Sequence, residues 1–493
     1  SSRADTFIIL SQLRQQQFDA ALVSITTLEK KQGADPLIWN YRGAAYLGKQ
    51  DAVRARDSFS QALKLDPAFF PAAANLAQID LKDKQPAAAR QRFEAILKAD
   101  PKHLNAMLAL ADLALRDKDE KAYVSWQEKA AAAHPQALQP RMALARYQLA
   151  KGDKNKALAT AREAANANPD NPAALDLLGT TQLALGDTTN ALGSYRKMVE
   201  RQPGQAVPLV KLASAQVAAK DLPGARKALQ DALRTQPDFL DAQMMLGGVE
   251  IQSGRFDDAQ KLAKQVQQQK PDKAVGFILE GDTAFARKDY PAAIAAFERA
   301  QKLEPSGALL VRQMQVFNAT QRPEEGEKRL VAWLATHPQD ASIRAALAEI
   351  LLKRKQYKAA AKHYVILNKS NPNNLLVLNN LAWSLFESKD NRALGFAEQA
   401  LKLKPDNPAV MDTLGWILVQ QGQIERGIKL LQQALSKAPD AAEIQFHLAS
   451  AFAQSGDPTR AQSELNRLLA SGAAFPQEPE ARALLKQLQG KTR

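Results

Sequence analysis

One proline that returns at a nearly fixed interval constrains this chain more than any other feature. It occurs every 34 residues from Pro67 to Pro305 and then at steps of 33 or 34 as far as Pro439. Proline cannot continue a helix interior, so each copy predicts the end of a helix. The interval therefore divides almost the whole sequence into short units that repeat one plan.

Within each unit the other fixed positions predict two packed helices. The tenth residue after the proline is small in eleven units, and leucine usually precedes it: Ala77, Ala111, Ala145, Gly179, Ala213, Gly247, Gly281, Ala348, Ala382, Gly415 and Ala449. A bulky residue there would overpack the helix pair by roughly 1–3 kcal/mol. Residues 406–439 show the plan clearly, with Gly422 between the helices and an apolar stripe from Ile424 to Leu435.

A helix-turn-helix period of 34 with these positions in phase resembles the tetratricopeptide repeat (TPR) family. The resemblance implies an all-α, right-handed α-α superhelix of about fourteen repeats, the first at 3–33 and the last at 440–475. We expect residues 1–475 to form one continuous array. The stretch AAFPQEPEARALLKQL predicts a capping helix in the tail at 476–493, with Phe475, Leu484, Leu485 and Leu488 on the last repeat.

Unit 306–338 fits the pattern least well. Gln315 stands at the small-residue position, and the interval to the next proline falls to 33. Either this unit is a looser joint between two stiffer half-arrays, or it shows ordinary divergence between repeats.

Composition excludes several classes of function. The net charge of +14 is spread along the repeats, which does not indicate nucleic-acid binding but leaves an acidic polysaccharide as an alternative partner. The chain has no cysteine, and its five histidines lack metal-ligand spacing. No apolar run approaches the ~18 residues of a membrane span. We therefore predict no catalytic residues, no metal and no cofactor.

A narrower resemblance rests on the segments NNLAW (379–383), DTLGW (412–416), FHLA (446–449) and ARALLKQL (481–488), in that order. It is to the TPR lipoproteins of exosortase (PEP-CTERM) systems, which accompany bacterial exopolysaccharide production and protein sorting. This implies an extracytoplasmic, periplasmic scaffold with a lipid anchor on an N-terminal cysteine. The chain begins Ser1-Ser2-Arg3, so we expect it to be cut from a longer protein with any anchor upstream.

The same segments predict a binding site. We call the proline that ends each repeat its closing proline. The residues seven and eleven positions after the closing proline of the preceding repeat should face the inner, concave side of the array. These residues are Asn379 with Trp383, and Asp412 with Trp416. Phe446 extends the row into the next repeat, and Glu349 adds a carboxylate from the repeat before. An exposed aromatic row flanked by polar groups suits an extended peptide or a sugar chain. Alternatively, both tryptophans fill the space between helices.

These observations predict a non-enzymatic scaffold that binds a protein or peptide partner in its concave groove. Two alternatives stay open. The array could bind an acidic polysaccharide directly, or it could be the regulatory or targeting part of a larger enzyme.

Overall fold

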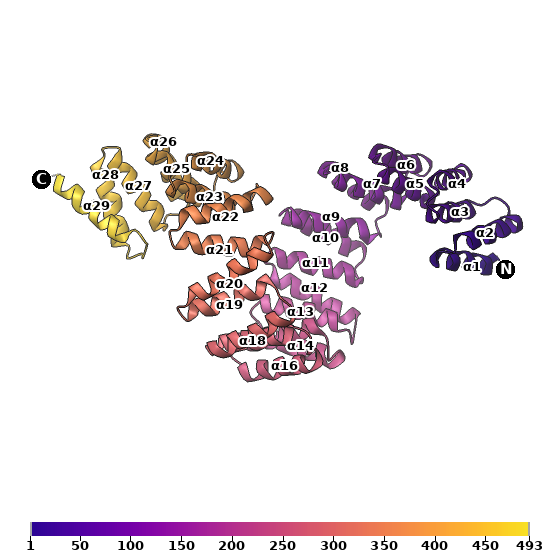
Figure 1. Ribbon diagram of the computed structural model, residues 1–493, viewed down its shortest axis with the longest axis horizontal. Helices are drawn as coiled ribbons and strands as arrows, with labels where there is room; N and C mark the ends of the chain where they lie inside the picture. The colour runs from indigo at the N-terminus through magenta and orange to yellow at the C-terminus, as the bar shows by residue number, and fades with distance from the viewer. Residues whose placement is uncertain (1, 492–493) are drawn as a thin grey trace. The chain divides into compact units, whose positions relative to one another are not determined.

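The chain folds into helices joined by short turns, and the computed structural model describes residues 2–491 (Figure 1). Within these residues there are 29 helices, of which the first 28 form fourteen helix-turn-helix pairs. We name the odd-numbered member of each pair the A helix and the even-numbered member the B helix. The predicted all-α fold with about fourteen repeats and a capping helix is confirmed.

The A helices are twelve or thirteen residues long. Their bounds are α1 (Ser2–Arg14), α3 (Pro36–Gly48), α5 (Phe70–Lys82), α7 (Leu104–Arg116), α9 (Leu138–Ala150), α11 (Pro172–Ala184), α13 (Ala206–Ala218), α15 (Leu240–Gln252), α17 (Val275–Ala286), α19 (Gly307–Ala319), α21 (Ala341–Lys353), α23 (Leu375–Glu387), α25 (Pro408–Gln420) and α27 (Ala442–Gln454).

The B helices follow each A helix after a short turn. Their bounds are α2 (Phe18–Gln32), α4 (Ala52–Leu65), α6 (Pro86–Ala99), α8 (Glu120–Ala133), α10 (Lys154–Ala167), α12 (Thr188–Arg201), α14 (Leu222–Thr235), α16 (Phe256–Gln269), α18 (Tyr290–Leu303), α20 (Pro323–Thr336), α22 (Tyr357–Ser370), α24 (Ala393–Leu403), α26 (Ile424–Lys437) and α28 (Pro458–Ala470). The additional helix α29 (Glu478–Lys491) follows α28.

The turn between A and B helices has a repeated local chemistry. One residue takes a left-handed backbone conformation in most repeats, for example Gly186 (φ 81°) and Lys288 (φ 64°). An aspartate often comes next, and its carboxylate accepts a hydrogen bond from a backbone N–H in the first turn of the B helix, as Asp187 and Asp289 do. Such N-caps satisfy donors that have no partner within the helix.

The small residue of each repeat lies where the two helices approach most closely. A Cβ added to Gly179 would lie 2.6 Å from Tyr195 Cζ, and one added to Gly281 would lie 2.4 Å from Phe297 Cε1. Tyr195 and Phe297 are 1% exposed, so their rings fill the space that the glycines leave. Burial raises the pKa of Tyr195 to about 12, although its hydroxyl group hydrogen-bonds to Thr180 at 3.0 Å.

The chain divides into two compact units, Ser1–Ala259 and Gln260–Arg493. One repeat position distinguishes their interiors. The thirteenth residue after the closing proline is polar and buried in five repeats of the first unit: Asp80, Gln148, Gln182, Gln216 and Glu250. In the second unit the same position is apolar and buried at Ala284, Leu351, Leu385, Leu418 and Phe452.

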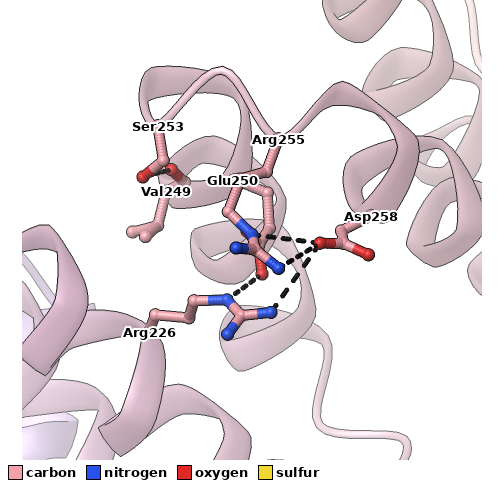
Figure 2. Close-up of polar contacts among 6 residues, drawn as sticks. All are labelled: Arg226, Val249, Glu250, Ser253, Arg255 and Asp258. Atoms are coloured by element: carbon pink, nitrogen blue, oxygen red, sulfur yellow. Dashed lines mark hydrogen bonds and ion pairs between the residues drawn. The ribbon is translucent and has the colours of Figure 1, made fainter.

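Figure 2 shows how the first unit compensates a buried charge at this position. Glu250 is 2% exposed, and Arg226 Nε donates to its Oε1 at 2.7 Å. Arg255 Nε lies 3.0 Å from Glu250 Oε2, and Arg255 also donates to Asp258 Oδ2 at 2.7 Å. Two arginines from different repeats therefore neutralise one carboxylate, which would be costly to bury alone.

In unit 306–338 the predicted position of Gln315 is wrong. Gln315 is exposed, and Met314 lies at the helix contact instead, because a Cβ added to Gly326 would lie 2.2 Å from Met314 Sδ. The shorter interval starts α19 one residue earlier, which shifts its register. Gln313 then takes the place of the usual leucine: it is 1% exposed, and its Nε2 has no partner among the described residues.

The C-terminal helix α29 covers the last repeat, as predicted. Phe475, Ala481 and Leu488 are buried in the same apolar cluster as Leu465 and Leu468 of α28. Leu484 and Leu485 pack against that cluster and are partly buried.

Candidate functional site

The residues proposed as a site lie on four successive A helices of the second unit. Glu349 is on α21, Asn379 and Trp383 are on α23, Asp412 and Trp416 are on α25, and Phe446 is on α27. Leu381, Leu414 and their buried neighbours fix the orientation of these helices, since they pack against the B helices. The tryptophans are left at the edge of the core, where each is only partly buried.

A histidine that the sequence analysis did not select holds four of these residues together. His447 on α27 is buried, and its Nδ1 donates to Asp412 Oδ1 at 2.8 Å. Its ring stacks on Trp416, with centroids 4.6 Å apart and an interplanar angle of 14°. The ring of Trp383 lies 5.9 Å away and that of Phe446 6.2 Å away. We name Trp383, Asp412, Trp416, Phe446 and His447 the aromatic cluster.

The two tryptophans therefore match neither sequence interpretation completely. Trp416 packs on the core of the last repeats as well as on the imidazole. The ring centroids of Trp383 and Phe386 lie 5.8 Å apart. Both rings keep part of their surface accessible while His447 bridges them. The cluster is thus a partly buried surface whose rings are fixed in place.

Phe446 connects the cluster to the C-terminal cap. Its ring lies 6.2 Å from that of Phe475, which precedes α29 and is buried. The orientation of Phe446 therefore depends on the docking of α29.

Two proposed residues do not join the cluster. Glu349 is exposed and pairs with Lys353 on its own helix at 2.7 Å, so no contact with the aromatic rings is recorded for it in residues 2–491. Asn379 is partly buried, and its Oδ1 is buried without a hydrogen-bond partner among the described residues. An unsatisfied buried amide oxygen costs free energy, so its occurrence beside Trp383 is unusual.

Two carboxylates lie at the edge of the aromatic cluster. Glu387 lies one helical turn after Trp383, and partial burial raises its pKa, while the nearby His447 and Lys355 lower it. Asp412 contributes a second carboxylate, and it is already hydrogen-bonded to His447. The arrangement can stack flat or apolar groups and can accept hydrogen bonds from a cationic group.

The repeat spacing contains the signal that could have identified His447. The seventh residue after one closing proline contacts the eighth after the next, which is 35 residues further on. Asn75 Nδ2 donates to Asn40 Oδ1 at 3.0 Å, and Lys211 Nζ lies 2.9 Å from Asp176 Oδ1. Asp412 and His447 have the same spacing. Residues that contact each other across neighbouring repeats in these three pairs are thus 35 positions apart, one more than the 34-residue period.

The structure gives two further observations about residues 2–491. No group of three or more His, Cys, Asp or Glu side chains within them could hold a metal ion. None of the helices in this described part combines the length and apolar character needed to cross a membrane.

The fourteen helix pairs define the class of this protein as a helical repeat solenoid. Two family models described as tetratricopeptide repeat match the chain, one at residues 8–68, 142–206 and 413–486, and the other at 46–110, 182–238 and 217–276. Together they cover more than half of the sequence. The chain belongs to the tetratricopeptide repeat proteins.

Individual relatives are distant. The TPR repeat-containing protein PA4667 of Pseudomonas aeruginosa is 26% identical over 155 residues, which are 31% of this chain and 26% of that protein. The match therefore spans about a quarter of the relative's length.

Three solved structures are similar to the chain, each with a TM-score below 0.5. The crystal structure of the APC/C hetero-tetramer Cut9-Hcn1 covers 99% of this chain and 96% of its own, at 14% identity and a TM-score of 0.41. A tetratricopeptide repeat protein from Parabacteroides merdae covers 50% of this chain and 96% of its own, at 13% identity and a TM-score of 0.38. YrrB, described as a TPR protein with an unusual peptide-binding site, covers 38% of this chain and 97% of its own, at 19% identity and a TM-score of 0.30.

Proposed function

We propose that this tetratricopeptide repeat protein is a non-enzymatic scaffold that binds an extended peptide segment of a partner protein along α23, α25 and α27. The observation that carries the proposal is the bridging of Trp383 and Trp416 by His447, which is itself held by Asp412. Aromatic faces fixed in this way lose little conformational entropy when a ligand stacks on them. Partly buried tryptophans are also frequent energetic anchors of protein interfaces.

Charge favours a peptide over an acidic polysaccharide at this surface. Glu387 and Asp412 lie beside the rings, and a polyanion would meet like charges there. An apolar peptide segment with a Lys or Arg residue fits better, because the side chain could stack while the cation meets a carboxylate. The overall charge of +14 remains the observation in favour of the acidic polysaccharide as a second candidate ligand.

The proposed setting is a bacterial envelope system for exopolysaccharide production and protein sorting of the exosortase type, outside the cytoplasm. Its support is the resemblance of the NNLAW and DTLGW segments alone.

Peptide selection tests the binding site. A phage-displayed library of random peptides is selected on the whole chain, and the selected peptides are titrated against the double variant Trp383→Ala, Trp416→Ala. We expect affinity to fall by at least about tenfold, the loss typical of truncating one interface anchor. Trp126→Ala is the control, since Trp126 is also a partly buried tryptophan but lies on α8 in the first unit.

Two results would contradict the proposal. If the selected peptides bind the double variant as tightly as the unaltered chain, the peptide site lies elsewhere. If the double variant loses more than ~3 kcal/mol of stability, the penalty for truncating a core aromatic residue, the tryptophans are core residues. Polygalacturonate is titrated in parallel. If polygalacturonate binds in a way that depends on Trp383 and the peptides do not bind in that way, the ligand is an acidic polysaccharide.

A further inference from the structure

A buried arginine in the second unit lacks a carboxylate partner. Arg344 on α21 is 8% exposed. Its Nη2 donates to the backbone oxygen of Pro338 at 2.5 Å, and its Nη1 donates to His363 Nδ1 at 3.3 Å. Among residues 2–491 no ion pair is recorded for it. A guanidinium group has five N–H donors. Nη1 and Nη2 of Arg344 each have an acceptor, and Nε is not among the buried nitrogens that lack a partner, so its N–H reaches solvent.

An earlier repeat has an arginine at the equivalent position with a carboxylate nearby. Arg141 follows Pro135 by six residues, as Arg344 follows Pro338, and it likewise donates to the oxygen of the closing proline, at 2.9 Å. However, Arg141 Nε also lies 3.8 Å from a carboxylate oxygen of Glu163, an ion pair without a hydrogen bond. The position of Glu163 corresponds to Ile366 in the later repeat, and that isoleucine is 44% exposed. The later repeat therefore keeps the arginine but replaces its acid with an apolar side chain.

A cavity of about 310 Å³ lies beside Arg344. Its walls include Gln339, Ile366, Leu367 and Lys369, and none of the residues that line it is acidic. The nearest carboxylate along the chain, that of Asp340, already accepts hydrogen bonds from Ser342, Ile343 and Trp333. The cavity thus combines two cations with an apolar wall.

The adjacent histidine supports this description. Burial, followed by the positive charges of Arg344 and Lys362, lowers the pKa of His363. A neutral His363 accepts from Arg344 and cannot act as a counter-charge. The positive potential around the guanidinium is therefore uncompensated by its neighbours on α22.

We propose that this cavity, the Arg344 pocket, binds a carboxylate group attached to a small aliphatic group. The ligand carboxylate takes the role that Glu163 has beside Arg141, and its aliphatic part contacts Ile366 and Leu367. A cavity of this size suits one amino-acid residue. The C-terminal residue of a peptide and a free aliphatic acid share this chemistry. The pocket is separate from the aromatic cluster, so its occupation does not depend on the peptide site proposed above.

The first experiment titrates the whole chain with N-acetyl-leucine and with N-acetyl-leucinamide, its uncharged isostere, and follows binding by NMR. We expect the acid to bind at least about tenfold more tightly than the amide, because hydrogen bonds to charged groups are the stronger ones. Equal binding of the two compounds, or no binding of either, would overturn the proposal and leave Arg344 as a residue that only fixes the turn at Pro338.

Two variants at one exposed position give the matched test. Ile366→Glu restores the carboxylate of the Arg141 repeat, so the acid should lose at least about tenfold in affinity because the internal charge competes for Arg344. Ile366→Gln introduces a polar group without a charge, so its affinity for the acid should stay within about threefold of that of the unaltered chain. If Ile366→Glu binds the acid as the unaltered chain does, the anion does not use Arg344 and the proposal fails.

A leucine-terminated peptide separates the two ligand sources, and both outcomes support the pocket. Tighter binding of the peptide than of N-acetyl-leucine indicates a peptide C-terminus. Equal binding indicates a small free acid.

Discussion

The close packing at Gly179 leads to a quantitative prediction for Gly179→Ala. The added Cβ would lie 2.6 to 2.9 Å from three ring atoms of Tyr195, distances at which something must move. The ring has little room to move, since Tyr195 is 1% exposed and its hydroxyl group is hydrogen-bonded to Thr180. Relief therefore requires α11 and α12 to separate.

Two terms of opposite sign decide the size of the effect. Replacing glycine by alanine inside a helix gains about 0.8–1 kcal/mol from helix propensity. Overpacking a filled core costs about 1–3 kcal/mol. The short contacts place Gly179→Ala at the upper end of that cost. However, Ala348 and Tyr364 occupy the same two positions in another repeat, so the helix pair can accommodate a methyl group. We expect a net loss of about 1–2 kcal/mol.

Hydrogen exchange is the suitable assay, because a repeat array of this length need not unfold in one step. A local loss of about 1–2 kcal/mol corresponds to a roughly 5- to 30-fold fall in protection of α11 and α12. Gly193→Ala in α12 is the control, because an added Cβ there meets nothing within 4 Å. It should gain about 0.8–1 kcal/mol from helix propensity alone. Equal protection in the two variants would refute the packing argument.

The remaining predictions concern the cap, the divergent repeat and two pH effects. Deleting residues 476–493 should expose Phe475 and the apolar face of α28, lower the melting temperature and promote self-association; an unchanged melt with a monomeric variant would contradict this. Gln313→Leu should remove a buried amide with an unpaired Nε2 and raise exchange protection across 309–334, by up to about 1–3 kcal/mol; lower protection would show that the hydrogen bond from Arg329 matters more. In the native chain, protection across 309–334 should be below that across 409–434. Tyr195 stays protonated in the folded state to pH of about 12, above its unfolded value of about 10, so its contribution to stability is lost as the pH rises between these values. Tyr195→Phe should flatten that part of the pH–stability curve measured by urea unfolding. Glu387→Gln should likewise remove a loss of stability as the pH rises above about 4, because the pKa of Glu387 is raised in the folded state.

The sequence by itself determined the architecture, because a solenoid depends on short-range signals that recur. Pro67 and its later copies mark where each B helix ends, and Gly179 or its equivalents mark where each helix pair must approach closely. The apolar positions of Phe475 and Leu488 likewise sufficed to predict the cap, since an exposed last repeat needs a cover. The choice of Trp383, Asp412 and Trp416 as residues on successive A helices used the same period.

Only the tertiary structure decided which side chains meet between repeats. His447 bridges the tryptophans because helix packing brings residues 35 apart into contact, one position beyond the period. The register of α19 depends on one residue lost from a turn, which exposed Gln315 and placed Met314 at the helix contact. Arg344 has no carboxylate at the place where Glu163 approaches Arg141 to 3.8 Å. Each of these depends on distances between side chains of different helices, and the spacing of residue types along the chain does not specify such distances.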